Sequence, residues 1–146
     1  MQDDVVTEAA IAAVIEAEVA REGPLLPILH KLQHMFAHVP ETALPMIAEA
    51  LNIGRAEVHG AMSFYPDFRT RPAQGRVVKI CRAEACQAQG GRALAEAAEA
   101  AEALSGRVTV EPVYCLGLCA NGPAAMVDER PMAAATVEKL AAAVAT

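Results

Sequence analysis

Four cysteines constrain this chain more than any other feature. They form two close pairs, Cys81 with Cys86 and Cys115 with Cys119, and the chain contains no other cysteine. Two pairs of thiols separated by an insert of helix length can be folded to one point, as a thiolate-bound metal requires. The number and pairing of the cysteines therefore predict a metal or iron–sulfur centre.

Three other roles for the cysteines compete with an iron–sulfur centre. A structural zinc site more often uses C-x-x-C pairs, and the gaps of four and three residues match that spacing poorly. Dithiol chemistry of the thioredoxin kind also uses C-x-x-C, which neither pair has. Free cysteines without a role are not expected to gather in two loops. The residues alone favour iron–sulfur chemistry and leave zinc as the main alternative.

Composition indicates the class of protein around this centre. With 146 residues, the chain is long enough for one ordinary domain or two small ones. Hydrophobic residues make up 54% of the chain, and alanine supplies much of this fraction, whereas aromatic residues make up only 3% of the chain. We therefore expect a mostly helical, closely packed core. The formal net charge of −6 argues against nucleic acid as a partner, because its binders usually present a concentrated basic face.

The sequence predicts a cytoplasmic protein with no membrane partner. Residues 1–4 are acidic rather than basic, and no apolar run approaches the roughly 20 residues of a membrane span. Thiols stay reduced in the cytoplasm, where cysteine clusters more often bind metals or act in catalysis than form disulfide frameworks.

The first half of the chain is predicted to be helical. Apolar residues recur at helical spacing over residues 5–21, and Gly23 and Pro24 end that pattern. A second helix should begin near Pro24, followed by helices over residues 42–51 and 55–64. The apolar stripe of the second helix consists of Leu25, Leu29, Leu32 and Phe36.

The composition changes between residues 65 and 76. Proline, arginine and glycine become frequent there, which is typical of a turn-rich linker. We therefore expect two domains, a helical bundle with its linker over residues 1–72 and an α/β domain over residues 73–146.

The second domain is predicted to be a small α/β layer structure. Strands at residues 77–80 and 107–113 lead directly into the two cysteine pairs. An alanine-rich helix over residues 90–104 lies between them, and a strand at 124–127 and a helix over 136–144 follow. Because each cysteine pair follows a strand, we expect both pairs to emerge at the same edge of one sheet.

Glycines and one arginine lie beside the cysteines. Gly90, Gly91 and Gly117 are expected to let backbone N–H groups approach the negatively charged site. Arg82 directly follows Cys81. We consider two roles for it, screening the negative charge of the reduced centre or occupying a solvated surface position.

Three segments of the chain resemble a known protein family. Residues 81–88 (CRAEACQA) and 113–124 (VYCLGLCANGPA) resemble the cluster loops of the thioredoxin-like [2Fe-2S] ferredoxin family, which includes the 24-kDa-type subunit of respiratory complex I. Residues 57–65 (EVHGAMSFY) resemble the Val-x-Gly-x-x-x-Phe-Tyr segment that precedes the family's ferredoxin domain. One departure is Pro131, which limits any strand after residue 127 to a short or edge position.

This resemblance implies a fold and a cofactor. The implied α/β fold is an N-terminal helical bundle followed by a thioredoxin-like [2Fe-2S] ferredoxin domain. Carried over residue by residue, Cys81, Cys86, Cys115 and Cys119 would ligate one [2Fe-2S] cluster, with one pair on each iron. FMN and NAD would lie on a partner subunit and not on this chain, which would transfer electrons without catalysing a reaction.

Within the family, the cysteine loops look most like those of the gamma subunit of soluble, NAD-dependent, molybdenum-containing formate dehydrogenases. The implied partners are a flavin- and NAD-binding iron–sulfur subunit and a large molybdenum-containing catalytic subunit. The equivalent subunit of an NAD-reducing hydrogenase or of complex I is an alternative, as is a free-standing ferredoxin. A structural zinc or assembly module is an alternative of another class.

Two further groups of residues carry weaker signals. His30, His34 and His38 are spaced like a helical row of metal ligands. The first two point away from the apolar stripe, which predicts a solvated or partner-facing surface. The second group is expected to be either a solvated linker or a docking patch for an acidic partner, and it consists of Arg69, Arg71 and Arg76.

Overall fold

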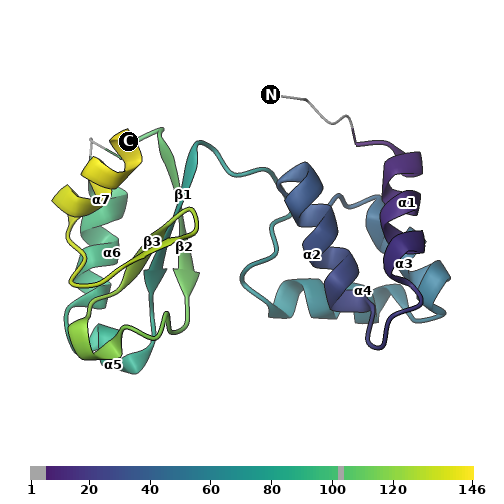
Figure 1. Ribbon diagram of the computed structural model, residues 1–146, viewed down its shortest axis with the longest axis horizontal. Coiled ribbons are helices and arrows are strands. Elements are labelled where there is room, and N and C mark those ends of the chain that lie inside the picture. The colour runs from purple at the N-terminus through teal and green to yellow at the C-terminus, as the bar shows by residue number, and fades with distance from the viewer. Residues whose placement is uncertain (1–5, 102–103) are drawn as a thin grey trace. The chain divides into compact units, whose positions relative to one another are not determined.

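The computed structural model describes residues 6–101 and 104–146. The chain forms two compact units, one ending at Pro72 and the other spanning Ala73–Thr146 (Figure 1). Each unit contains a hydrophobic core of its own. Among the described residues, no helix is both long enough and apolar enough to cross a membrane.

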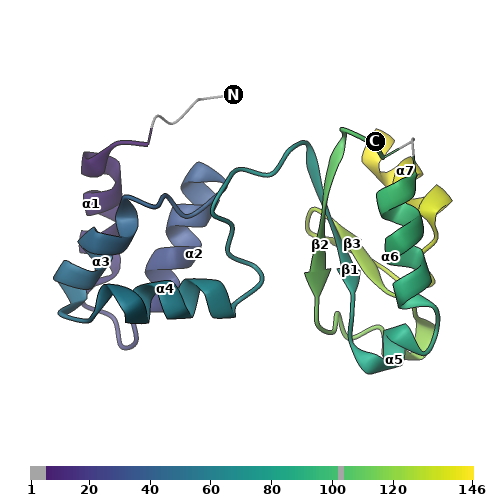
Figure 2. The same cartoon turned by 180° about the vertical axis from the view of Figure 1, so that it is seen from behind.

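The described part of the first unit is helical, as the apolar periodicity predicts. Its helices are α1 (Glu8–Glu18), α2 (Leu25–Phe36), α3 (Ala43–Leu51) and α4 (Arg55–Phe64). Helices α1 and α4 each contact both α2 and α3, which gives a small bundle (Figure 2). Helix α1 is shorter than the expected 5–21 because Thr7 caps its start, with the Thr7 hydroxyl accepting a hydrogen bond from the Ala10 N–H at 3.1 Å. Residue 5 lies outside the described residues.

The apolar faces of these helices meet in one core. In the stripe predicted for α2, Leu29, Leu32 and Phe36 are buried, whereas Leu25 is only half-buried at the edge of the core. Fully buried partners from all four helices include Ile11, Ile28, Ile47 and Val58. The predicted helix periodicity thus correctly identifies the packed face.

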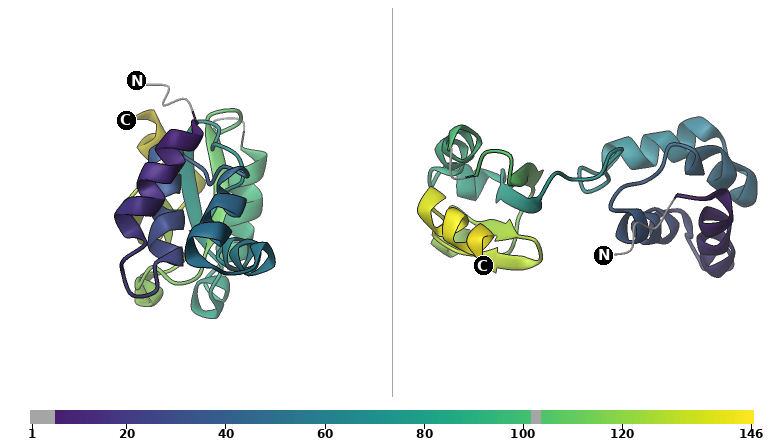
Figure 3. Two further views of the ribbon diagram at one scale, coloured as in Figure 1. Left: turned by 90° about the vertical axis from the view of Figure 1, so that its right-hand side faces the viewer. Right: turned by 90° about the horizontal axis from the view of Figure 1, so that it is seen from above.

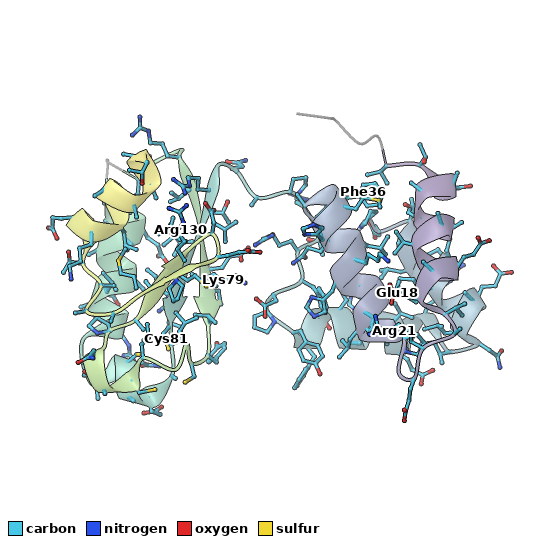
Figure 4. All side chains as sticks on the ribbon, in the orientation of Figure 1. Glu18, Arg21, Phe36, Lys79, Cys81 and Arg130 are labelled. Atoms are coloured by element: carbon cyan, nitrogen blue, oxygen red, sulfur yellow. The ribbon has the colours of Figure 1, made fainter. Side chains whose placement is uncertain are left out.

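Glu18 is the buried charged residue of the described core. Its carboxylate accepts hydrogen bonds from Lys31 of α2 and from Arg21, each at 2.8 Å. These bonds lower the pKa of Glu18, with the Lys31 contact the larger cause. Figure 4 labels Glu18 and Arg21 near the end of α1. The carboxylate therefore ties the end of α1 to α2.

The second unit combines four strands with helices among the described residues. Its elements are β1 (Arg76–Cys81), α5 (Glu84–Gln87), α6 (Gly91–Ala100), β2 (Val108–Val113), a 3₁₀ turn η1 (Cys119–Asn121), β3 (Ala125–Val127), β4 (Arg130–Met132) and α7 (Val137–Ala145). The strand order in the sheet is β2-β1-β3-β4. Strand β1 pairs parallel with β2 and antiparallel with β3, so the sheet is mixed. The predicted α/β fold class is confirmed.

Helices α6 and α7 cover the sheet. They contact each other, and α6 contacts β1 while α7 contacts β3 (Figure 3). Alternate residues of β1 point into the resulting core, where Val78 and Ile80 are fully buried. The helices contribute Leu94, Ala95, Ala98 and Leu140 to the same core.

The structure corrects the end of one helix and agrees with the expectation for the last strand. Helix α6 ends at Ala100 and not at residue 104; residues 102–103 lie outside the described residues. Leu104 is 1% exposed in the second unit's core, and Gly106 (φ 68°) follows before β2 begins. Strand β4 contains Pro131 and is a three-residue edge strand, as a proline in that position requires.

Arg76 has a structural role that was not predicted from the sequence. Its Nε donates a hydrogen bond to Asp128 Oδ2 at 2.8 Å, and its Nη1 donates to the carbonyl oxygens of Ala143 and Val144 at 2.9 and 3.1 Å. The side chain thereby joins β1 to the β3–β4 turn and to the end of α7. The expectation that Arg76 belongs to a solvated linker is wrong, because Arg76 lies in β1 and its side chain makes these contacts. The alternative of a docking patch that includes Arg69 and Arg71 stays a prediction.

Candidate metal centre

The parallel pairing of β1 and β2 brings the two cysteine loops to the same edge of the sheet. Cys81, the last residue of β1, is in register with Val113, the last residue of β2, and Cys115 follows two residues later. The Arg82 N–H continues the pairing by donating to the Val113 carbonyl at 2.8 Å. Figure 4 labels Cys81 at this edge. The predicted common edge is confirmed.

All four thiols are free and lie close to one another. The Sγ atoms of Cys115 and Cys119 are 3.5 Å apart. The Cys115 N–H points to Cys81 Sγ at 3.4 Å, and the Cys81 and Cys86 thiols share a hydrogen bond. Negative charge on Cys115 is one of the smaller causes of the raised pKa of Cys86. The structure thus gathers the four cysteines that stand out in the sequence.

Backbone N–H groups point at the sulfur of Cys81. Burial raises the pKa of the Cys81 thiol, but N–H groups of Ala83, Cys115 and Leu116, together with the Cys86 thiol, donate to the sulfur and outweigh burial. The net effect is a lowered pKa, which favours the thiolate. A thiolate is the form that binds metals.

The pKa values of two neighbouring thiols, those of Cys86 and Cys119, are raised instead. Burial is the main cause of the raised pKa of Cys86, whereas the raised pKa of Cys119 comes first from its hydrogen bond with Cys115. Crowding negative charge on several sulfurs is unfavourable without a cation between them. Four thiols with this mutual influence form a site that positive metal ions would stabilise.

The two cysteine pairs differ in exposure. Cys81 and Cys86 are 0% and 1% exposed and pack with Ala124 in a small apolar cluster. Cys119 is half-buried and Cys115 is exposed. The loop of residues 115–119 is therefore the side of the site that faces outward.

Glycines allow the backbone to approach this site closely. Gly91, at the start of α6, has no room for a side chain, because a Cβ there would lie 2.8 Å from the carbonyl oxygen of Cys86. Gly117 (φ 76°) donates its N–H toward Cys115 Sγ at 3.4 Å. The prediction that a glycine N–H approaches the site is confirmed at Gly117. For Gly90 and Gly91 it stays a prediction.

Arg82 is neither fully solvated nor without an opposite charge beside it. Its guanidinium is 3.7 Å from a carboxylate oxygen of Glu99 on α6, and its side chain is 31% exposed. The arginine charge is thus partly balanced by Glu99, which weakens any screening of charge on the neighbouring sulfurs.

The histidine row of α2 lies on the surface, as predicted. His30 and His34 are exposed, and the ring of His30 contacts that of Phe68 in a tilted arrangement, at a centroid distance of 4.8 Å. His38 lies beyond the end of α2, where its Nδ1 is 2.8 Å from the Phe36 carbonyl oxygen. Among residues 6–101 and 104–146, no three His, Cys, Asp or Glu side chains are arranged to hold a single metal ion.

Two features beside the cysteines were not predicted from the sequence. Helix α5 places Cys86 within its single turn, and the side chain of Gln89 crosses to the loop that contains Cys119. A four-residue helix is too short to show periodicity, and glutamine is not a metal ligand. No local signal in the sequence distinguishes Gln89 from a solvated glutamine.

Known proteins have sequences that are similar to most of this chain. The chain is 28% identical to the HndA subunit of the NADP-reducing hydrogenase of Solidesulfovibrio fructosivorans, over 82% of this chain and 74% of that protein. It is 31% identical to a subunit of the NADH-quinone oxidoreductase of Escherichia coli K12, over 70% of this chain and 66% of that protein. Both relatives are named as subunits.

A solved structure and a family model agree with these relatives. A crystal structure of an NAD⁺-reducing [NiFe]-hydrogenase in the air-oxidised state contains a chain that matches with a TM-score of 0.63 and 26% identity, over 83% of this chain. This chain spans only 22% of that polypeptide. The model of the thioredoxin-like [2Fe-2S] ferredoxin family matches residues 11–146, which include most of the first unit, all of the second and all four cysteines. The chain therefore belongs to the thioredoxin-like [2Fe-2S] ferredoxin family.

Proposed function

We propose that this chain is an electron-transfer subunit of an NAD-linked oxidoreductase complex. The family implies one [2Fe-2S] cluster, and we assign Cys81, Cys86, Cys115 and Cys119 as its ligands. The observation that carries this proposal is the gathering of four free thiols at one edge of the sheet, with backbone N–H groups directed at the sulfurs. A cluster bound here supplies the transfer of one electron at a time.

The family and the pairing of the cysteines in the sequence support two irons over a single zinc ion. Zinc gathers four ligands around one ion. A [2Fe-2S] cluster shares its four thiolates between two irons, so that each iron needs only one pair. The sequence pairs, Cys81 with Cys86 and Cys115 with Cys119, match this division.

The exposure of the cysteines supports a role in transfer to a partner. The buried pair is held by β1 and α5, while the loop that carries Cys115 and Cys119 faces outward. Tyr114, next to Cys115, is 64% exposed. We infer that an electron-transfer partner approaches the cluster from the side of residues 114–119.

We further propose that this partner binds flavin and NAD and that the helical unit helps to dock it. Phe64, Tyr65 and Phe68 form a row of aromatic rings that begins at the last residue of α4, with neighbouring ring centroids 5.1 and 6.1 Å apart. Phe64 is 77% exposed. The segment is held against α2, where the Gln33 side chain accepts a hydrogen bond from the Arg69 N–H at 2.6 Å. Exposed, pre-organised aromatic residues are typical of binding surfaces.

For the parent complex we propose a cytoplasmic, NAD-dependent, molybdenum-containing formate dehydrogenase. The support is the likeness of the two cysteine loops to its gamma subunit. The second candidate for the parent complex is an NAD-reducing hydrogenase or complex I. The named relatives favour it, because one is a hydrogenase subunit and another is a subunit of NADH-quinone oxidoreductase. Purification of the complex from its own host decides between them, since a molybdenum centre, a nickel centre or a quinone-reducing activity would identify the parent enzyme.

Anaerobic purification with metal analysis tests the cofactor assignment. We expect about two iron and two sulfide per chain, visible absorption, and a low-temperature EPR signal that develops on reduction. Serine at each of the four cysteine positions should lower the iron content or alter the EPR signal. A colourless protein with one zinc per chain and no EPR signal after reduction would overturn the proposal.

A further inference from the structure

The side chain of Gln89 connects the two cysteine loops. Its Nε2 donates hydrogen bonds to the carbonyl oxygens of Ala85 and Cys119, both at 2.8 Å. Its Oε1 accepts a hydrogen bond from the Gly122 N–H at 3.0 Å. One primary amide therefore joins the loop of Cys86 to the loop of Cys119, and Cys119 lies 30 residues after Gln89 in the chain.

The backbone of Gln89 is anchored to the first loop. Its N–H donates to the carbonyl oxygen of Cys86 at 3.2 Å, and the chain turns at Gly90 (φ 93°) directly afterwards. The same residue thus contacts Cys86 through its backbone and Cys119 through its side chain. In the proposed cluster site these two cysteines belong to different pairs.

Gly122 makes room for the amide. A Cβ at Gly122 would lie 2.9 Å from Gln89 Nε2 and 3.1 Å from its Cδ. The backbone of Gly122 has φ −72°, which other residues also adopt, so the glycine is not required by its own conformation. The close approach of the Gln89 side chain explains the absence of a side chain here.

Only an amide satisfies all three contacts. A carboxylate has no N–H and would face two carbonyl oxygens, whereas a primary amide offers donors and an acceptor together. Asparagine has the same groups on a side chain that is shorter by one methylene. The contacts are therefore specific for both the chemistry and the length of glutamine.

We propose that Gln89 is a positioning residue that fixes the spacing between the two cysteine pairs. This proposal rests on the proposed function, because it concerns the same four thiols. With the amide in place, the loop of residues 115–122 is held at a fixed position beside α5. The four sulfurs are thereby arranged before metal binds. Without it, the two loops are linked near the sulfurs by fewer contacts and the pairs separate more easily.

If Gln89 only stabilised the fold, its substitution would lower the melting temperature of the protein. Gln89 and its hydrogen bonds are exposed, so water can replace them when the side chain is removed. We therefore expect little change in thermal stability on substitution. The effect should appear in the cluster site itself.

The test compares cluster-loaded Gln89→Ala, Gln89→Glu and Gln89→Asn with the wild-type chain. The readouts are the half-time of cluster loss to an iron chelator under anaerobic conditions, the EPR signal of the reduced protein, and deuterium uptake of the peptide that covers residues 113–122. Gln74→Ala is the control, because Gln74 is an exposed glutamine before β1, at the opposite end of the strand from Cys81.

We expect Gln89→Ala and Gln89→Glu to lose the cluster several-fold faster, on the order of tenfold at most for the loss of neutral hydrogen bonds. They should also shift the EPR signal and speed deuterium uptake, with an unchanged melting temperature. Gln89→Asn should lie between these variants and the wild type, and Gln74→Ala should match the wild type. Unchanged chelation, EPR and uptake in Gln89→Ala would overturn the proposal, as would a fall in melting temperature that accounts for the cluster loss.

Gly122→Ala provides a second test that leaves Gln89 intact. The added methyl should displace the end of the Gln89 side chain and reproduce the faster cluster loss. Gly122→Ala and Gln89→Ala both act through the contact between these two residues. The double variant should therefore lose the cluster no faster than either single variant. Additive effects would overturn the proposal. A wild-type chain without iron would instead overturn the proposed function, and deuterium uptake would still report on the link between the loops.

Discussion

Gly91 lies directly against the carbonyl group of Cys86. A Cβ at Gly91 would come within 2.8 Å of the Cys86 carbonyl oxygen and 3.1 Å of the Cys81 carbonyl oxygen. Both obstacles are backbone atoms, which cannot move aside as a flexible side chain can. The start of α6 thus sets how closely the helix approaches the buried cysteine pair.

Gly91→Ala should therefore separate α6 from the cysteine loops. We expect the free energy of unfolding to fall by about 1–3 kcal/mol, as for other overpacked sites, and the iron content after reconstitution to fall with it. Chemical denaturation and iron analysis measure the two effects. Gly60→Ala in α4 is the matched control, because a Cβ there meets nothing within 4 Å and alanine should stabilise the helix by about 0.5–1 kcal/mol. Equal stability of the Gly91 variant and the wild type would contradict the steric argument.

Phe64→Ala tests the aromatic surface without disturbing the core. Because Phe64 is 77% exposed, its removal should change the free energy of unfolding by less than about 0.5 kcal/mol. If the partner docks there, the amount of flavin-containing subunit that co-purifies should fall at least about fivefold, the effect of losing an interface anchor. Met35→Ala, at a 41% exposed position of α2, is the control. Full co-purification with the Phe64 variant would contradict docking at this surface.

Arg76→Ala removes the link between β1, the β3–β4 turn and α7. Three hydrogen bonds are lost, two of them to backbone carbonyls at the end of α7. The side chain is 33% exposed, so we expect a modest destabilisation of about 1–2 kcal/mol. Denaturant melts measure this, and faster deuterium uptake at residues 137–145 should accompany it. Arg76→Lys should recover only part of the loss, because lysine lacks the planar fork that reaches several acceptors. A variant as stable as the wild type would rule out this bracing role.

Glu18→Gln should destabilise the helical unit in a pH-dependent manner. The pKa of Glu18 is lowered from 4.5, mainly by the hydrogen bond from Lys31 and then by that from Arg21. A carboxyl group whose pKa is lower in the folded state stabilises that state above its unfolded pKa, and the contribution is lost as the pH falls through the folded pKa. The wild type should therefore melt a few degrees above the variant at neutral pH. Thermal melts should show this difference shrinking below about pH 4.5. A constant difference across this range would point to packing rather than charge.

Local patterns in the sequence predict much of the fold because helices and strands have short periods. The stripe of Leu29, Leu32 and Phe36 identifies the buried face of α2, and strand residues before each cysteine pair place both pairs at one edge. Pro131 likewise limits β4 to the edge of the sheet, since proline has no N–H to donate to a neighbour. These inferences need only residues that are near one another in the chain.

The sequence by itself determined the four cysteines, their pairing and the strands that lead to them, because these depend on residue type and local spacing. Only the tertiary structure decided which pair is buried, that Arg76 braces α7, and that Gln89 reaches Cys119. The contacts of Arg76 and Gln89 join residues 30 or more positions apart. Such contacts arise when strands pair and helices pack, and neither glutamine nor arginine carries a local signal that specifies its distant partner.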